Sequence, residues 1–188
     1  LETLRYRNQL DNTLVIFSSD NGGDIPGSSQ KVSRPETQAI GHGLQINGEL
    51  RGDKHTLWEG GTRVPFIVSW PGRVEAGAVS NDMINLIDVF ATVCEITDGQ
   101  VPISKNIAPD SYSFLPSLMQ STDKQGRNSM VTADVAGMQA IRRGNWKYID
   151  NRVPDGKQKG QPQLYNLAAD PSESVNLHNE EPDTAKKL

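Results

Sequence analysis

The chain has 188 residues, of which 35% are hydrophobic and 22% are charged, and its formal net charge is -4. This length supports one substantial hydrophobic core, or a core and a small satellite domain. Nineteen Lys and Arg against 23 Asp and Glu exclude a broad electrostatic surface for nucleic acid or anionic lipid, and a single cysteine excludes an internal disulfide framework. An anionic ligand would therefore have to be met by a local cluster of cations.

No apolar run is long enough for a membrane-spanning helix, and no signal-peptide pattern opens the chain. Residue 1 is a leucine, and the segment LETLRYRNQL leads directly into DNTLVIF as a helix leads into a strand. We therefore expect the chain to be part of a longer protein that has further residues before Leu1. On that expectation, the missing targeting signal carries no information about the compartment.

Alternating helices and strands are predicted for residues 1 to about 100. Residues 13–17 (TLVIF) and 64–70 (VPFIVSW) are short apolar runs, as is typical of strands that are buried on both faces of a sheet. The second run ends at the turn-forming Pro71-Gly72 pair. Between the runs, residues 22–62 contain many glycines and little periodicity, which indicates a long functional loop.

A helix is predicted from about Asp82 to Thr97, with Gly99 as its C-terminal cap. Its N-cap would be Ser80 or Asn81. One face is apolar and is expected to be buried, and the other is polar. The apolar face consists of Met83, Ile87, Phe90 and Cys94, and the polar face of Asn85, Asp88, Thr92 and Glu95. Cys94 is therefore expected to be a small core hydrophobe and not a nucleophile.

The pattern changes after a polar, proline-containing connection over residues 101–126. Short strand-like runs follow, separated by Gly, Asn, Asp and Pro, which predicts a small antiparallel meander. The runs are SMVTADV (129–135), MQAIRRG (138–144), NWKYID (145–150) and QLYNL (163–167). The final segment EPDTAKKL (181–188) predicts a closing helix. Together these elements predict an α/β fold in which residues 1–100 belong to a large mixed sheet with flanking helices and residues 127–188 form a small antiparallel subdomain.

One candidate site is the Asp20-Asn21 pair, which directly follows the carboxyl end of the first predicted strand. Ligands of open α/β sheets bind at that edge. A carboxylate and an amide oxygen side by side suit a hard divalent cation such as Ca²⁺ or Mg²⁺. The alternative interpretation is an ordinary turn at the end of a strand.

A second candidate site is the cationic segment LRGDKHTLWEGGTRVPF, residues 50–66. Lys54 offers a compact point charge, and Arg51 and Arg63 offer forked donors, a set that suits a tetrahedral oxyanion. The Gly60-Gly61 pair would let backbone approach a ligand closely. The alternative interpretation is a solvated loop in which neighbouring carboxylates pair with these bases.

Blocks of the sequence, taken in order, resemble the carboxyl-terminal half of a sulfatase of the arylsulfatase type, within the alkaline-phosphatase-like superfamily. The blocks are TLVIFSSDNGG (13–23), NGELRGDKHTLWEGGTRVPFIVSWPG (47–72), DMINLIDVFATVCEITDG (82–99), AIRRGNWKYI (140–149) and QLYNLAADPSESVNL (163–177). The resemblance implies that residues 1–100 are the carboxyl-terminal part of the catalytic α/β domain of such an enzyme. It also implies a sulfate ester substrate and a secreted or periplasmic location.

The resemblance assigns roles to individual residues. Asp20 and Asn21 match the pair that completes a Ca²⁺ site in this family, with Mg²⁺ as the alternative, and Lys54 matches the lysine that contacts the sulfate of the substrate. His55 and Arg51 lie beside Lys54 and are further candidates for substrate contact. Metal and lysine together would neutralise the sulfuryl oxygens and the charge that develops on the leaving oxygen.

The nucleophile implied by the resemblance is not expected within these residues. Such enzymes use a formylglycine made from the Cys or Ser of a C/S-x-P-x-R motif early in the chain. The segment SWPGR (69–73) fits that pattern, but it lies at the end of a predicted strand, and its Pro-Gly pair already has a structural role as a turn. His42 and His178 lie outside the block that would supply the leaving-group acid. We therefore expect the isolated chain to be catalytically incomplete.

Two alternatives remain open at this point. A phosphonate or phosphate monoester hydrolase of the same superfamily would use the same metal and lysine, and its nucleophile motif would differ. A non-catalytic module that binds sulfated glycans would bind sulfate without dependence on a metal.

Overall fold

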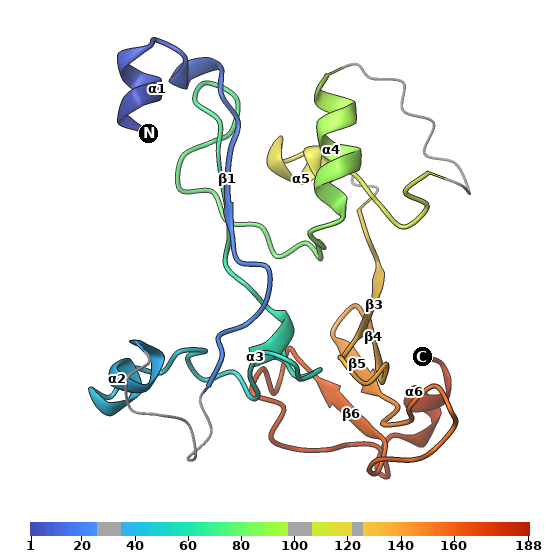
Figure 1. The fold of residues 1–188 in the computed structure, drawn as a ribbon. Coiled ribbons are helices and arrows are strands. Elements are labelled where there is room, and N and C mark those ends of the chain that lie inside the picture. Colours follow the sequence, from blue (N-terminus) through green and yellow to red (C-terminus); the bar gives the residue numbers. More distant parts are fainter. Residues whose placement is uncertain (26–34, 98–106, 122–125) are drawn as a thin grey trace. The chain divides into compact units, whose positions relative to one another are not determined.

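The computed structural model describes residues 1–25, 35–97, 107–121 and 126–188. In chain order the elements are α1 (Glu2–Tyr6), the short 3-10 helix η1 (Leu10–Asn12), β1 (Val15–Ser18), α2 (Pro35–Gly41), α3 (Glu59–Thr62), β2 (Phe66–Ser69), α4 (Asp88–Ile96), α5 (Leu115–Leu118), β3 (Ser129–Ala133), β4 (Gln139–Arg143), β5 (Trp146–Ile149), β6 (Gln163–Asn166) and α6 (Pro182–Lys186) (Figure 1). No helix in these ranges is long and apolar enough to cross a membrane.

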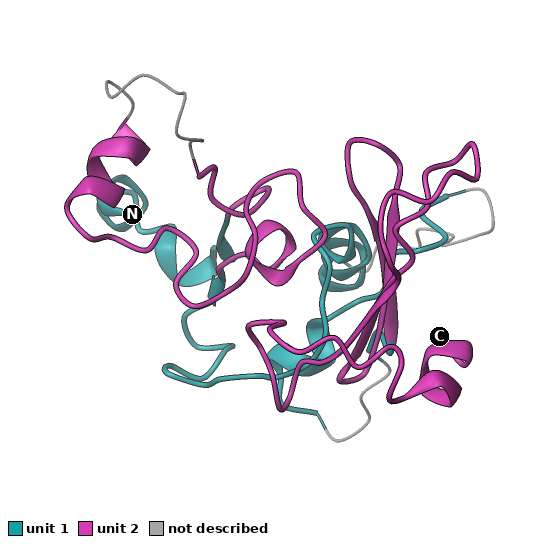
Figure 2. Cartoon of the chain, turned by 90° about the horizontal axis from the view of Figure 1, so that it is seen from below, with its two compact units in different colours: residues 1–18, 66–128 teal, residues 19–65, 129–188 magenta. Residues whose placement is uncertain are grey.

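The chain divides into two compact units, which are coloured separately in Figure 2. Unit 1 contains residues 1–18 and 66–128, and unit 2 contains residues 19–65 and 129–188. The small antiparallel sheet of unit 2 begins at Ser129. The predicted loop segment 22–62 joins the C-terminal sheet and not the strands that flank it in sequence, and it contains the short helices α2 and α3.

In unit 1, both predicted strands are present, and β1 pairs antiparallel with β2. The prediction that they are buried on both faces is wrong. Phe17 lies opposite Ile67 in the register, and these side chains are 64% and 60% exposed. The other face is the covered one: the ring of Phe66 meets that of the buried Phe114 edge-on, with centroids 5.4 Å apart. A ribbon with one covered face shows the alternating burial that is seen along β2.

The predicted turn after β2 is confirmed. The N–H of Arg73 donates to the carbonyl oxygen of Trp70 at 3.0 Å, and Gly72 has a φ of +71°. A positive φ at the third position of a turn is the conformation that glycine adopts without steric cost. The segment 69–73 is therefore the end of β2 followed by a turn. This agrees with the reason for which the segment was rejected as a nucleophile motif.

The helix predicted from Asp82 begins six residues later, at Asp88. Ser80 lies too far before it to be its N-cap, and the Ser80 hydroxyl accepts the N–H of Asp82 at 3.1 Å. The turn before the helix is instead closed by Asn85 and Asp88. Asn85 Oδ1 accepts the N–H of Ile87 at 3.2 Å, and Asp88 Oδ2 accepts the N–H of Asn85 at 2.7 Å, in the reciprocal manner of a capping box.

The prediction for the two faces of α4 is wrong in part. Ile87 and Phe90 are 48% and 43% exposed, whereas Asp88 and Thr92 are buried. Asp88 and Thr92 are buried because the segment 111–114 packs against them through hydrogen bonds. Thr92 Oγ1 accepts the N–H of Phe114 at 3.0 Å, and Asp88 Oδ1 accepts the N–H of Tyr112 at 2.9 Å. Cys94 is half-buried.

Unit 2 is built on a four-stranded antiparallel sheet in the order β3-β4-β5-β6. All of its strands were predicted from sequence, and so was the closing helix α6. The core of unit 2 joins this sheet to the preceding loop segment. It consists of Leu57, Ala140, Ile149, Tyr165 and Leu167, with Trp58 and Met138 packed against it. Leu57 is therefore the point at which the long loop enters the hydrophobic core of the C-terminal sheet.

Candidate functional site

The Asp20-Asn21 pair lies in a turn that follows β1 in the chain and belongs to unit 2. Ser19 Oγ donates to the carbonyl oxygen of Asn21 at 2.8 Å, which holds the turn in shape. The side-chain amide of Asn21 donates to the carbonyl oxygen of Gly22 at 2.8 Å, so that its Oδ1 atom is left as an acceptor. Asp20 is exposed and Asn21 half-buried. The turn thus presents a carboxylate and an amide oxygen, the donor types that Ca²⁺ and Mg²⁺ prefer.

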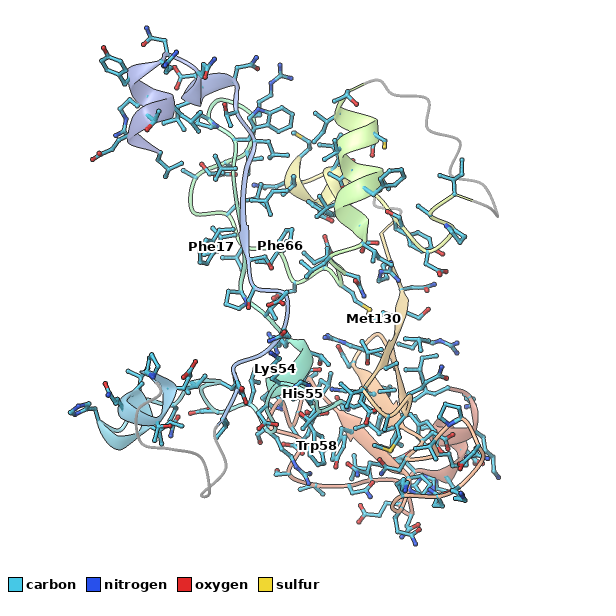
Figure 3. The ribbon with its side chains drawn as sticks, viewed as in Figure 1. Phe17, Lys54, His55, Trp58, Phe66 and Met130 are labelled. Atoms are coloured by element: carbon cyan, nitrogen blue, oxygen red, sulfur yellow. The ribbon has the colours of Figure 1, made fainter. Side chains whose placement is uncertain are left out.

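Lys54 and His55 occupy the tip of a tight turn in unit 2 (Figure 3). Thr56 Oγ1 donates to the carbonyl oxygen of Asp53 at 2.7 Å and accepts the N–H of the same residue at 3.1 Å. His55 has a φ of +79°, a strained conformation for a residue with a side chain. The Lys54 ammonium makes no ion pair with any described residue. The turn therefore leaves both side chains available to a ligand.

Backbone hydrogen bonds fix these two turns to each other. The N–H of Gly22 donates to the carbonyl oxygen of Gly61 at 3.0 Å, and the N–H of Lys54 donates to that of Gly23 at 3.0 Å. Asn47 reinforces the junction, since its Oδ1 accepts the N–H of Gly23 at 2.7 Å and its Nδ2 donates to the carbonyl oxygen of Gly52 at 3.0 Å. The turn that contains Asp20 and Asn21 and the turn that contains Lys54 are thus joined through backbone and Asn47 hydrogen bonds.

The double glycine serves this junction and not a ligand, which corrects the interpretation drawn from the sequence. A Cβ added to Gly60 would lie 2.4 Å from the carbonyl oxygen of Gly52, and one added to Gly61 would lie 2.3 Å from that of Thr56. A Cβ on Gly22 would lie only 1.7 Å from the carbonyl oxygen of Gly60. The backbone that approaches Gly60 and Gly61 so closely is the chain's own.

The guanidinium of Arg51 has partners within unit 2. Its Nη1 donates to the carbonyl oxygen of Glu173 at 2.8 Å and to the hydroxyl of Tyr165 at 3.1 Å, and the group lies 4.1 Å from the ring centroid of Trp58. These contacts tie the loop to the C-terminal sheet. Arg63 lies 3.9 Å from Glu59 and is largely exposed. Of the cationic segment, Arg51 and Arg63 therefore have partners within unit 2, whereas Lys54 makes no ion pair with a described residue.

A buried charge cluster lies beneath this loop, formed by Glu59 of α3, Lys147 of β5 and Glu173. Lys147 Nζ lies 3.0 Å from Glu59 Oε1 and 3.0 Å from Glu173 Oε1. Glu173 Oε2 also accepts the backbone N–H of Glu59 at 2.5 Å. The cluster anchors the segment that follows Lys54 to the sheet.

Sequence reasoning missed this cluster, although one signal was present. In β5 the side chains alternate, so Lys147 lies on the same buried face as Ile149. A lysine at an inward position of a strand demands a buried carboxylate partner. Its partners lie far away in the sequence and could not be identified from spacing.

Burial raises the pKa of two titratable groups in this region. Burial raises the pKa of the Glu173 carboxyl above its ordinary value, an effect that the ammonium of Lys147 opposes. Burial likewise raises the pKa of the Tyr165 phenol, against the lowering effect of Arg51. Neither Glu173 nor Tyr165 is a candidate ligand. Their pKa shifts are therefore attributed to the structural contacts under the loop.

The two remaining histidines of the chain are His42 and His178. His42 is exposed just after α2, and His178 packs against the ring of Tyr148, with centroids 5.9 Å apart. In the described ranges, no three or more His, Cys, Asp or Glu side chains are grouped so that they could hold a metal ion. Asp20 and Asn21 fit a cation by donor type, and two such donors are fewer than the roughly six to eight oxygen ligands that Ca²⁺ takes.

Comparison with known proteins places the chain in a family. Residues 1–99 match the family model described as Sulfatase. The chain is 33% identical over its whole length to an N-acetylgalactosamine-6-O-sulfatase of Bacteroides thetaiotaomicron, of which it spans 37%. It is 29% identical to human arylsulfatase A over 89% of the chain and 34% of that protein.

The fold agrees with these matches. A solved structure from work on the metabolism of multiple glycosaminoglycans by B. thetaiotaomicron superimposes with a TM-score of 0.82 and 33% identity, over 100% of this chain and 39% of that one. The α/β fold class is thereby confirmed. The chain spans little more than a third of the length of the proteins it matches. On the family model and on its similarity over the full length to a curated sulfatase, the chain belongs to the sulfatase family.

Proposed function

We propose that this chain is part of a sulfuric ester hydrolase, in which it supplies the lysine that contacts the sulfate and two oxygen ligands of a Ca²⁺ ion. The observation that carries the proposal is the pair of backbone hydrogen bonds, Gly22 to Gly61 and Lys54 to Gly23, that join the two turns. Catalytic groups act best when their positions are fixed before the substrate arrives. Family membership supports the same assignment.

Each residue has a distinct task in this proposal. The Asp20 carboxylate and the Asn21 amide oxygen would hold the cation, which supplies positive charge to the sulfuryl oxygens when it is bound. The ammonium of Lys54, which has no internal partner among the described residues, would donate to a sulfuryl oxygen and stabilise negative charge on the leaving oxygen. His55, exposed beside it, would contact the substrate. The formylglycine nucleophile would come from residues outside this chain.

The experiment is a comparison of esters with the whole protein. Release of sulfate from N-acetylgalactosamine 6-sulfate or 4-nitrophenyl sulfate is expected, with turnover of 4-nitrophenyl phosphate at least tenfold slower. Removal of Ca²⁺ by a chelator should abolish turnover, and its return should restore it. Faster turnover of the phosphate ester would favour a phosphatase. Binding of sulfated glycan that is independent of metal and accompanied by no turnover would favour a binding module.

Asp20→Asn and Asn21→Ala test the metal assignment. Each removes one oxygen ligand or its charge, so a higher Ca²⁺ concentration should be needed for half-maximal activity. Asp24→Asn, a nearby change outside the pair, is the control. An unchanged Ca²⁺ requirement in both site variants would contradict the assignment.

A further inference from the structure

The side chain of Asn47 bonds to both turns of the candidate site. Its Oδ1 accepts the N–H of Gly23 at 2.7 Å, and its Nδ2 donates to the carbonyl oxygens of Gly23 at 3.2 Å and of Gly52 at 3.0 Å. Gly23 lies two residues after Asn21, and Gly52 lies two residues before Lys54. One planar amide, with both of its N–H bonds in use, therefore joins the chain beyond the first turn to the chain before the second.

The carbonyl oxygen of Gly23 is shared between Asn47 and Lys54. It accepts the backbone N–H of Lys54 at 3.0 Å and Nδ2 of Asn47 at 3.2 Å. A carbonyl oxygen has two lone pairs, so both bonds can be present together. The packing is tight, because a Cβ added to Gly23 would lie 2.0 Å from Cγ2 of Ile46 and 2.8 Å from Oδ1 of Asn47. The place of the Lys54 backbone is therefore tied to a group that Asn47 holds.

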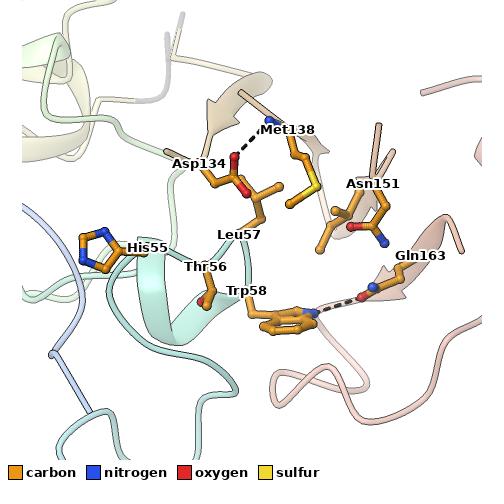
Figure 4. A pocket seen from close by; sticks show the side chains of 9 residues that line it. His55, Thr56, Leu57, Trp58, Asp134, Met138, Asn151 and Gln163 are labelled. Carbon is orange, nitrogen blue, oxygen red and sulfur yellow. Dashed lines mark hydrogen bonds between the residues drawn. The ribbon is translucent and has the colours of Figure 1, made fainter. Parts of the chain in front are cut away.

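The chain after Lys54 is held by other contacts. Leu57 is 5% exposed and belongs to the core of unit 2. Trp58 Nε1 donates to Gln163 Oε1 at 3.0 Å, and Figure 4 shows this bond together with Leu57. Loss of the Asn47 bonds would leave these contacts in place. We therefore expect the effect of such a loss to be local to the two turns, without unfolding of unit 2.

We propose that Asn47 is a positioning residue for the Lys54 ammonium, an inference that rests on the proposed function. Asn47 acts through the backbone and is assigned no contact with the substrate. By holding the carbonyl groups of Gly23 and Gly52, it sets the place of Lys54 relative to the turn that precedes Gly23. A displacement of about 1 Å at a catalytic group lowers a rate by as much as about 100-fold. Turnover is therefore expected to depend on the Asn47 amide.

Asn47→Asp tests the Nδ2 donor. It keeps the size of the side chain and the Oδ1 acceptor, but its second oxygen would face the carbonyl oxygens of Gly23 and Gly52 and offer them no hydrogen. Asn47→Leu has a similar shape and no charge, so it separates the loss of the bonds from the effect of a new carboxylate near Lys54. The two variants should behave alike if the bonds decide the result.

Asn176 supplies the matched control, because its amide makes the same kinds of bond elsewhere in unit 2. Its Oδ1 accepts the N–H of Leu164 at 3.0 Å, and its Nδ2 donates to the carbonyl oxygen of Pro162 at 3.1 Å. Asn176→Leu therefore removes an amide that holds backbone, as Asn47→Leu does, but one whose described bonds involve neither turn.

A double-mutant cycle on the whole protein tests the positioning role. The kcat for 4-nitrophenyl sulfate is measured at a temperature at which every variant is folded. Asn47→Asp and Asn47→Leu should each lower kcat by roughly tenfold or more in wild type and by less than about twofold in the Lys54→Ala background, because a residue that acts through Lys54 has no effect without it. Asn176→Leu should stay within about twofold of its parent in both backgrounds. Equal losses in the two backgrounds, equal losses in Asn47→Leu and Asn176→Leu, or a loss in Asn47→Asp that Asn47→Leu does not share overturns the positioning role.

Amide hydrogen exchange tests the same bonds without turnover. In Asn47→Leu the N–H groups of Gly23 and Lys54 should exchange faster by roughly tenfold or more, while the amides of β5 exchange as in wild type. Unchanged exchange at Lys54 overturns the inference. Absence of sulfate ester hydrolysis by wild type would count against the proposed function, and the exchange result would then decide by itself whether Asn47 holds Lys54 in place.

Discussion

The N–H of Gly22 donates to the carbonyl oxygen of Gly61 at 3.0 Å, although the two residues are far apart in the sequence. This bond joins the turn that contains Asp20 and Asn21 to the loop that contains Lys54. The contact is so close that neither side has room for a side chain. The glycines that punctuate this region therefore set the geometry of the candidate site.

Gly22→Ala should destabilise unit 2 by about 3 kcal/mol, since the new Cβ would collide with backbone that cannot move aside. Unfolding in urea measures the change. Gly41→Ala is the matched control, because no atom lies within 4 Å of its added Cβ, and it should change stability by about 1 kcal/mol or less. Similar midpoints for the two variants would show that the junction is not tightly packed.

Lys147→Met should lower the free energy of unfolding by about 3–5 kcal/mol. It leaves the buried carboxylates of Glu59 and Glu173 without their shared cation. Lys157→Met is the control, because its pair with Asp155 is exposed to solvent and should contribute little to stability. Chemical denaturation of both variants measures their free energies of unfolding. Equal values for the two variants would show that the buried cluster does not stabilise the fold.

The raised pKa of Glu173 predicts a specific pH dependence of stability. Between the ordinary value of 4.5 and the raised value, the carboxyl is protonated in the folded chain and ionised in the unfolded chain. The folded state then binds more protons, so the free energy of unfolding falls as the pH rises through this window. In Glu173→Gln this contribution should be absent. If the free-energy difference between wild type and variant does not change across the window, the shift is not present.

Asp88→Asn should destabilise unit 1 by about 3 kcal/mol. The carboxylate of Asp88 accepts from Arg127 Nη2 at 2.6 Å and from Arg127 Nε at 3.0 Å, and both side chains are almost fully buried. Glu95→Gln, at an exposed position of the same helix, should have an effect within about 0.5 kcal/mol. Thermal unfolding followed by circular dichroism compares the two, and equal melting temperatures would show that the pair with Arg127 does not hold α4.

The C-terminal sheet could be predicted from sequence because its signals are local. Each strand carries its own apolar pattern, and the hairpin turns between β3, β4 and β5 contain glycines, as at Gly144, whose φ is +56°. The closing helix has the same local character, since its charges are ordered along one short segment.

The errors arose where distant residues decide the outcome. Two polar residues of α4 are buried because Tyr112, Phe114 and Arg127 bind to them, and none of these three lies near the helix in sequence. Arg51 was a candidate ligand by charge alone, and its internal partners, Tyr165 and Glu173, lie more than 100 residues away. The roles of Asp20 and Lys54 came from the resemblance of the blocks to a family, because spacing alone favours neither a site nor a plain loop.

The most direct test of the account is the turnover of a sulfate ester by the whole protein with Lys54→Ala, beside Lys157→Ala as a surface control. Loss of one donor to a developing oxyanion should lower turnover by roughly two to three orders of magnitude. Stability should be unchanged, because the Lys54 ammonium has no ion-pair partner among the described residues. A decrease smaller than about fivefold, with the control unaffected, would contradict the placement of Lys54 at the sulfate.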